Sequence, residues 1–572
     1  MSPKTLIRSG MLFDGTGTPG READVEIVDG KISRVGAHLS ADSHELIDAR
    51  GCIITPGFVD MHTHFDGHVI WDSCLAPTSM HGVTTVVMGN CGIGFAPCKP
   101  QDRERLIGLM ETIEDIPETV LKAGLKWSWS SFPEYLDTLA AQQFDVDVAA
   151  QLPHGPLRVH VMGERAVRRE KASAQDMAQM QRLAREAVRA GAVGFSSSRV
   201  RSHKTKSGDF TPDYMAAEEE LQAIAAGLKA EGKGVLQFVT DISDQREAGV
   251  AEFQLLRRLV QQSGRPLSLN ITQREADPDG WMRLMNMIGE ANAARENIKG
   301  QVMGRGIGLV LGWELTDNPF TGYPSYAPLH HLPLAEKVRQ LADPEVRRRI
   351  LSEQDKDPLH GKRVAMHERL FEVAENPDYE PPVEDSIGWR AHKLGIAPAE
   401  LAYDVMMKNG GRGLLHRPLL NYAAGNLDAV YEMLTDPHGV PGLSDGGAHC
   451  GMTCDSSITT FNLAYWTRDR SPERGPRLPL AQMVQCLTQR PAQFLGFRDR
   501  GVIAPGMKGD VNVIDYDSLR LYPVEVVYDY PAAGRRLIQR ASGYKATLVS
   551  GELIVRDDCH TGARPGRLLR SA

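Results

Sequence analysis

A chain of 572 residues is longer than a typical single domain, and its 42% apolar residues are enough for a large core. Its net charge of −8 is mild for this length and argues against a nucleic-acid or anionic-membrane partner. No apolar run approaches a bilayer span, the first residues lack the apolar segment of a secretion signal, and eight cysteines are too few for a disulfide framework. We therefore expect a cytoplasmic protein with a small-molecule substrate and no nucleic-acid or membrane partner. Whether it forms a homo-oligomer is left open.

Both ends of the chain carry the pattern of short β-strands. Near the N-terminus, polar and apolar residues alternate on both sides of Asp29-Gly30, a dipeptide typical of two-residue hairpin turns. The same alternation recurs near the C-terminus on both sides of Ser550-Gly551. We expect residues 1–55 and 500–572 to form one small β domain, with the middle of the chain inserted into it.

In the middle, from residue 56 to residue 499, strands alternate with helices. The apolar segments typical of buried strands are residues 57–64, 84–90, 145–152, 192–196, 235–239 and 267–271. Helical segments separate the later ones, and the clearest of these runs from a cap at Ser173 to Gly191. This alternation predicts βαβ units, a parallel sheet and a closed α/β barrel of the (β/α)8 TIM-like type.

The alternation weakens between about residues 274 and 404, which we interpret as an insertion in the barrel. Long segments of this kind in compact enzymes are lids or binding elements, and a surface decoration is the equally open alternative. The pattern resumes with a seventh strand at residues 419–422 and an eighth at residues 439–443. The barrel domain would then comprise residues 56–499, including the insertion.

Residues able to bind a metal follow several of these strands. His62 and His64 lie two apart at the end of the first strand, so their side chains share one face and could bind one ion together. Neutral imidazole suits zinc, iron or nickel. Cys91, His154 and Asp445 follow the second, third and eighth strands. Because parallel barrels carry their active sites at the carboxyl ends of the strands, this pattern predicts a metal centre there.

Several segments resemble the metal-dependent amidohydrolase superfamily, and in particular its D-aminoacylase (N-acyl-D-amino-acid deacylase) branch. They are residues 57–64, residues 82–93 with their Gly-Asn-Cys-Gly turn, Ser444-Asp445-Gly446, residues 154–158 and residues 505–510. The resemblance covers both ends and most barrel strands, but not the insertion. It implies a (β/α)8 barrel with a small β-sandwich and hydrolysis of an amide-type C–N bond by metal-activated water.

The resemblance implies roles for four of these residues. His62, His64 and Cys91 would be metal ligands, and Asp445 would contact the metal and shuttle a proton. A divalent ion lowers the pKa of water and polarises a carbonyl group. A carboxylate at hydrogen-bond distance can accept the water proton and return it to the departing nitrogen. Near a metal, Cys91 would be a thiolate. The implied cofactor is a divalent ion, most simply Zn2+.

The sequence departs from the deacylases at important positions. Their fifth and sixth strands end in histidine ligands, whereas the corresponding strands here continue without one. We therefore favour one ion over two, since catalytic zinc needs about three protein ligands. Asp241, Gln273 or His203 could substitute for the missing histidines, or be pocket or surface groups. The arginine that holds a substrate carboxylate after the eighth-strand aspartate is also not evident.

His154, Arg199 and Gln273 are the candidate substrate-binding residues. Arg199 could recognise an anionic or carbonyl group, or simply solvate a loop. The leading hypothesis is a metal-dependent hydrolase that cleaves the amide bond of an N-acyl amino acid or a related amide. The alternatives are a ring-opening hydrolase or a decarboxylase with the same fold, and a degenerate barrel that binds a ligand without turnover.

Overall fold

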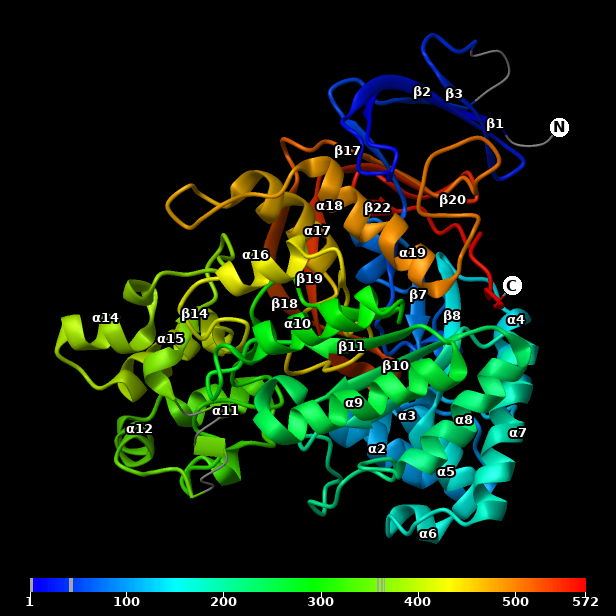
Figure 1. The fold of residues 1–572 in the computed structure, drawn as a ribbon. Coiled ribbons are helices and arrows are strands. Elements are labelled where there is room, and N and C mark those ends of the chain that lie inside the picture. The colour runs from blue at the N-terminus through cyan, green and yellow to red at the C-terminus, as the bar shows by residue number, and fades with distance from the viewer. Residues whose placement is uncertain (1–3, 41–44, 357–359, 362–363, 365, 572) are drawn as a thin grey trace.

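The computed structural model describes residues 4–40, 45–356, 360–361, 364 and 366–571. Figure 1 shows a central barrel, a β-sheet at one end of it that contains the N-terminus, and a lobe of short helices at its side. Every helix in the described ranges is too short or too polar to cross a lipid bilayer.

The centre of the molecule is an eight-stranded parallel sheet. Its strands are β6 (Phe58–Asp60), β7 (Val83–Met88), β8 (Asp147–Pro153), β9 (Gly194–Arg199), β10 (Val235–Thr240), β11 (Leu267–Ile271), β12 (Ile298–Val302) and β16 (Gly439–Pro441). A parallel bridge from Thr63 to Gly446 joins the ends of the first and last strands and closes the barrel. All six residues of β7 are buried, as expected for a strand that is covered on both faces. The predicted TIM-like arrangement is thus present.

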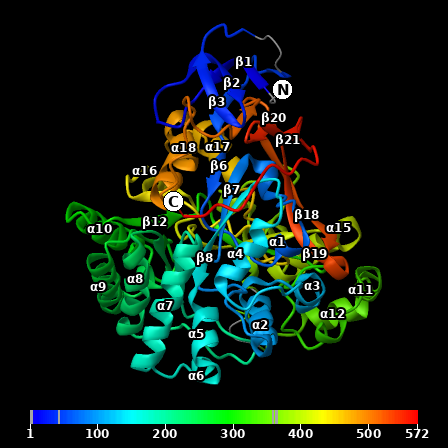
Figure 2. The same cartoon turned by 90° about the vertical axis from the view of Figure 1, so that its right-hand side faces the viewer.

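Helices surround this sheet (Figure 2). In chain order they are α1 (His68–Trp71), α2 (Arg103–Glu114), α3 (Glu118–Gly124), α4 (Phe132–Ala140), α5 (His154–Met162), α6 (Glu164–Val167), α7 (Ala174–Ala190), α8 (Glu218–Glu231), α9 (Arg246–Ser263), α10 (Gly280–Ala293), α16 (Asp428–Thr435), α17 (Ile458–Ala464), α18 (Leu480–Leu487) and α19 (Gln489–Leu495). The predicted caps of α7 are confirmed: Ser173 and Asp176 form a capping box, and Gly191 ends the helix with φ 118°.

The two ends of the chain share one nine-stranded sheet. Its strands are β1 (Lys4–Leu12), β2 (Arg21–Val28), β3 (Lys31–Gly36), β4 (Glu45–Asp48), β5 (Ile53–Pro56), β17 (Val511–Ile514), β20 (Tyr544–Val549), β21 (Glu552–Arg556) and β22 (Cys559–His560). The antiparallel pair of β5 and β17 joins the N-terminal strands to the C-terminal ones. A separate hairpin of β18 (Arg520–Tyr530) and β19 (Gly534–Ser542) lies against the barrel. The division of the chain into a sandwich domain and a barrel domain stays a prediction.

The predicted seventh barrel strand is wrong. Residues 419–420 belong to β15 (Leu415–Leu420), which pairs antiparallel with β13 (Ile307–Leu311) and β14 (Phe371–Glu372) outside the barrel. The seventh barrel strand is β12, which lies inside the stretch that we expected to be the insertion, residues 274–404. Lys299 and Gly300 interrupt the apolar pattern of β12, and this interruption hid the strand.

The insertion therefore begins after β12 and continues beyond residue 404 to α16. Its helices are α11 (Leu334–Leu341), α12 (Pro344–Leu351), α14 (Ile387–Leu394) and α15 (Pro398–Gly411). They pack around a hydrophobic cluster of their own, in which Trp313, Tyr326 and Tyr403 are almost completely buried. A core of this size indicates a folded subdomain rather than a loose loop.

Candidate metal centre

Closure of the barrel brings the first and last strands' polar ends together. The Asp445 backbone amide donates to the His62 carbonyl at 3.2 Å, and the His64 amide donates to the Gly446 carbonyl at 2.8 Å. The Ser444 hydroxyl donates to Asp60 Oδ2 at 2.5 Å and fastens the same junction from within the barrel. Asp445 therefore lies beside both histidines although more than 380 residues separate them in the sequence.

The turn that carries Cys91 is held by the side chain of Asn90. Asn90 Nδ2 donates to the carbonyls of Thr63, at 3.1 Å, and Val87, at 2.9 Å. Cys91 has φ 55° and Asp445 has φ 49°, a left-handed conformation that is uncommon outside glycine and that clusters at functional sites. The tertiary structure thus fixes both side chains at a cost in backbone strain.

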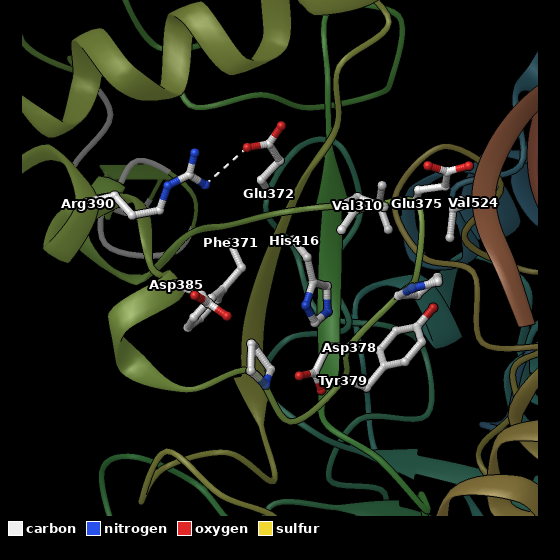
Figure 3. A pocket seen from close by; sticks show the side chains of 14 residues that line it. Val310, Phe371, Glu372, Glu375, Asp378, Tyr379, Asp385, Arg390, His416 and Val524 are labelled. Atoms are coloured by element: carbon white, nitrogen blue, oxygen red, sulfur yellow. Dashed lines mark hydrogen bonds and ion pairs between the residues drawn. The ribbon is translucent and has the colours of Figure 1, made fainter. Parts of the chain in front are cut away.

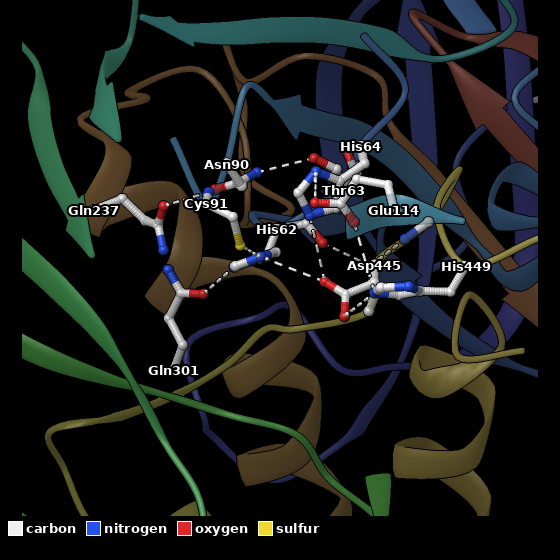
Figure 4. A network of polar contacts seen from close by, with 12 residues as sticks. His62, Thr63, His64, Asn90, Cys91, Glu114, Gln237, Gln301, Asp445 and His449 are labelled. Carbon is white, nitrogen blue, oxygen red and sulfur yellow. Dashed lines mark hydrogen bonds and ion pairs between the residues drawn. The ribbon is translucent and has the colours of Figure 1, made fainter. Parts of the chain in front are cut away.

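Four donor side chains converge in this region (Figure 4). His62 Nε2 lies 3.2 Å from Cys91 Sγ and 3.4 Å from Asp445 Oδ1, and His64 Nε2 lies 3.7 Å from the same carboxylate oxygen. The donor atoms of His62, His64 and Cys91 are all within 4.8 Å of one another. Ligands that surround zinc tetrahedrally at its usual bond lengths are about 3.3 to 3.6 Å apart. The separations of the donor atoms are therefore close to those of a tetrahedral site.

The electrostatics of the four side chains also suit a cation. Burial lowers the pKa of His62 to about 4 and that of His64 well below its usual value, so both rings are neutral and can act as ligands. Burial, together with the negative charges of Glu114 and Asp445, raises the pKa of the Cys91 thiol well above its usual value. A divalent ion would reverse this effect and stabilise the thiolate. The donor set thus fits a divalent metal.

Two further residues lie behind the ligand histidines, and sequence reasoning missed both. Gln301 Oε1 lies 2.6 Å from His62 Nδ1, and Glu114 Oε1 lies 3.6 Å from His64 Nδ1, a buried atom without a hydrogen-bond partner among the described residues. Oxygen acceptors at this position orient a ligand histidine and make it a better donor to the metal. Gln301 was missed because its strand, β12, was missed.

A signal for Glu114 is present in the sequence. It follows Leu106 and Met110 at intervals of four residues, so it lies on the buried stripe of α2, and all three side chains are at most 1% exposed. A carboxyl group on such a stripe needs a partner, so this pattern could have marked Glu114 as a candidate site residue. Burial, together with the charge of Asp445, raises the pKa of Glu114 well above its usual value.

Two basic side chains border the centre on its more open side. His449 Nε2 lies 3.6 Å from Glu114 Oε2 and 3.9 Å from Asp445 Oδ2. Arg536, on β19, lines a small cavity of about 20 Å3 together with Asp445 and donates to both carboxylate oxygens of Asp529, at 2.8 and 2.9 Å. A guanidinium group is thus close to the centre, although no arginine follows Asp445 in the sequence.

The fifth and sixth strands carry buried amides, Gln237 and Asn270. Gln237 Oε1, on β10, accepts a hydrogen bond from the Cys91 backbone amide at 3.0 Å. Asn270, on β11, binds the backbone of Thr240 at 2.6 and 3.1 Å. His203 Nδ1 lies 2.8 Å from Ser198 Oγ, and burial lowers the pKa of His203 to about 4.

The remaining candidate substitutes for a histidine ligand have other partners. Asp241 accepts hydrogen bonds from Arg201 and Arg274, at 2.9 to 3.2 Å. Gln273 Oε1 accepts from the Ala423 backbone amide at 3.1 Å and so ties β11 to the insertion. Their roles at the metal or in substrate binding stay predictions.

His154 and Arg199 also bind residues outside the donor set. The ring nitrogens of His154 lie 2.8 Å from Ser197 Oγ and 2.9 Å from Glu220 Oε1, and the side chain is fully buried. Arg199 is buried and forms an ion pair with the partly exposed Glu252. The structure brings together His62, His64, Cys91 and Asp445, whereas the substrate-binding roles of His154 and Arg199 stay predictions.

Comparisons with known proteins agree with this architecture. The amidohydrolase family model matches residues 45–555. The D-aminoacylase of Alcaligenes xylosoxydans xylosoxydans is 30% identical over 294 residues, which cover 51% of this chain and 55% of that enzyme. An uncharacterized protein of Mycobacterium tuberculosis is 26% identical over 608 residues, which cover 99% of this chain and 95% of that protein.

Solved structures of similar proteins share the fold. A D-aminoacylase described as having a binuclear metal centre superimposes with a TM-score of 0.65 at 22% identity, and 99% of each chain is covered. The N-acyl-D-glutamate deacylase of Bordetella bronchiseptica, complexed with zinc and a phosphonate inhibitor, gives a TM-score of 0.64 at 21% identity, and 100% of each chain is covered. The resemblance noted in the sequence is thereby confirmed. The chain belongs to the amidohydrolase family, in its D-aminoacylase-like branch, and is a hydrolase of carbon–nitrogen bonds other than peptide bonds.

Proposed function

We propose that this protein hydrolyses the amide bond of an N-acyl amino acid or a related amide at a single divalent ion, Zn2+. His62, His64 and Cys91 would hold the ion, with Asp445 beside it and the fourth tetrahedral position open to water. The observation that carries the proposal is the approach of His62 Nε2 to both Cys91 Sγ, at 3.2 Å, and Asp445 Oδ1, at 3.4 Å. These spacings suit ligands of one tetrahedral ion.

The ion, when bound, supplies activation of water and polarisation of the scissile carbonyl group. Asp445 accepts the proton of the attacking water and delivers it to the departing nitrogen. Burial raises the pKa of Asp445 to about 6 when no ion is present, and a bound cation would oppose this rise and keep the carboxylate ionised as a proton acceptor. Gln301 and Glu114 orient the rings of His62 and His64.

One ion rather than two is supported by the amides on the fifth and sixth strands. Gln237 is committed to the Cys91 backbone, and Asn270 to the Thr240 backbone. Neither side chain is a usual zinc ligand, because zinc prefers cysteine, histidine and carboxylate donors. His62, His64 and Cys91 therefore supply the donors for a single position.

The guanidinium group of Arg536, which lines the small cavity beside Asp445, is already paired with both carboxylate oxygens of Asp529, so the support for an anionic substrate comes from similar proteins. Similar proteins named for their substrates, an N-acyl-D-aspartate deacylase and an N-acyl-D-glutamate deacylase, are both 31% identical over less than half of this chain. We therefore propose a substrate that carries a carboxylate next to the amide bond.

The test combines metal analysis with a substrate panel. Protein purified without chelator should contain about one zinc per chain, and His62→Ala and Asp445→Ala variants should lose it, whereas His331→Ala in the insertion should retain it. Zinc-loaded protein is then assayed with N-acyl-D-amino acids, N-acyl-L-amino acids, hydantoins and aryl amides. Release of free amino acid from the acylated substrates supports the proposal. Hydantoin cleavage alone would make the protein a ring-opening hydrolase, and persistent absence of metal would make it a binding protein without turnover.

A further inference from the structure

The insertion contains a cavity of about 430 Å3 that is separate from the metal centre (Figure 3). Its apolar walls come from three strands and the segment after β14, namely Val310, Phe371, Val373, Pro377, Tyr379, Pro381 and Val524. None of the described residues that line it belongs to the donor set or to the small cavity beside Asp445. Its volume lies within the range of about 300 to 1,000 Å3 that is typical of small-molecule sites.

The clearest sign of a ligand is the side chain of His416, on β15. It is only 9% exposed and points into the cavity (Figure 3), and neither ring nitrogen makes a hydrogen bond within the part of the chain that the structure describes. Its ring meets that of Tyr379 edge-on, with the centroids 5.9 Å apart. Burial, together with the charge of Arg305, lowers its pKa to about 3, so the ring is neutral. A buried imidazole thus offers the cavity one donor and one acceptor that the protein does not use.

Negative charge is in excess around the cavity. Four carboxylates border it, those of Glu372, Glu375, Asp378 and Asp385. Arg390 and Lys408 both pair with Glu372, at 3.0 and 2.5 Å, and Arg474 pairs with Asp378 at 2.5 Å. Glu375 and Asp385 form no ion pair with any described residue, and Figure 3 places them on opposite sides of the cavity. The four carboxylates thus exceed these three cations by one negative charge, which favours a cationic ligand over an anionic one.

We propose that this cavity is a second small-molecule site, which binds an organic amine with an aromatic or branched apolar body. The body would lie against the rings of Phe371 and Tyr379. The ammonium group would face one of the two carboxylates that form no ion pair, Glu375 or Asp385. His416 would pair with a polar group of the ligand and so satisfy the nitrogen that the protein leaves open. The proposal concerns binding alone and is independent of the reaction at the metal centre.

Titration calorimetry with the full, metal-loaded chain tests the proposal. The probes are phenethylamine and 3-phenylpropionate, which share an aromatic body and differ in the sign of their charge. We expect the amine to bind and the carboxylate not to bind. The double variant Glu375→Gln/Asp385→Asn should bind the amine about three- to ten-fold more weakly, as expected from the loss of two exposed charges. Glu345→Gln, which removes an exposed carboxylate on α12 far from the lining, is the matched control and should leave the affinity unchanged.

Two further variants keep the test decisive. His416→Leu should reduce the affinity at least about fivefold and leave the melting temperature equal or higher, because an unpartnered buried polar group is removed. Ala374→Trp should block the cavity, and since Ala374 is exposed, the fold should tolerate the larger side chain. The proposal is overturned if phenethylamine does not bind, if both probes bind equally well, or if neither single variant changes the affinity.

Discussion

Replacement of Gln301 by methionine should weaken metal binding more than any other single change outside the donor set. Gln301 Oε1 lies 2.6 Å from His62 Nδ1, and its Nε2 donates to Ser268 Oγ at 2.9 Å, all within the buried barrel interior. Loss of a residue that orients a ligand histidine typically costs ten- to a hundred-fold in metal affinity. This range corresponds to about 1.4 to 2.7 kcal/mol.

The same change should also lower the stability of the metal-free protein. It leaves His62 Nδ1 and Ser268 Oγ buried without partners, and each unpaired buried group costs about 1 to 3 kcal/mol. We therefore expect a loss of roughly 2 to 6 kcal/mol in the free energy of unfolding. Stability and metal affinity must accordingly be measured separately.

Competition for zinc with a chromophoric chelator measures the affinity, and denaturant unfolding of the metal-free protein measures the stability. Asn512→Leu is the matched control, because it removes a fully buried amide that donates to the Gly82 carbonyl at 2.9 Å, outside the donor set. It should lose stability and keep the zinc affinity of the parent protein. A zinc affinity of Gln301→Met within about threefold of the parent would refute the idea that Gln301 orients His62.

Three further predictions concern the metal and the insertion. Chelation of the metal should lower the free energy of unfolding by about 4 kcal/mol when zinc had been present at 1,000 times its dissociation constant, and an unchanged melting temperature would contradict the metal centre. Glu114→Gln should lower zinc affinity about tenfold, as measured by chelator competition, because His64 loses its carboxylate partner; equal affinity would argue against that partnership. His360 lies between Asp317 and Asp355; burial lowers its pKa, but the hydrogen bonds and charges of the two aspartates outweigh burial and raise it to about 9. The resulting stabilisation should be about 1 to 2 kcal/mol after allowance for partial exposure. It should be complete below pH 6.5 and disappear as the pH rises to 9 and above. The unfolding midpoints at pH 6 and pH 9.5 should therefore differ less in His360→Gln than in the parent protein.

The sequence was sufficient to predict those strands and turns whose residue pattern lies within a single segment. Apolar segments identified seven of the eight barrel strands, and the turn dipeptide Asp29-Gly30 identified a hairpin whose two turn residues have φ 53° and 74°. Such signals survive because burial on both faces and positive φ restrict the residue types at each position. The insertion was misplaced because Lys299 and Gly300 weaken the pattern of β12, whereas residues 419–420 imitate a barrel strand.

By itself, the sequence determined the parallel barrel, the small β-sheet built from both ends, and the candidate donors His62, His64, Cys91 and Asp445. These depend on residue type and on position at strand ends, which are local properties. Only the tertiary structure decided that Glu114 and Gln301 stand behind the ligand histidines, and that His416 points into a cavity. These contacts depend on which distant segments meet when the barrel closes and the insertion folds. The spacing of residues along the chain does not give the distances between such segments.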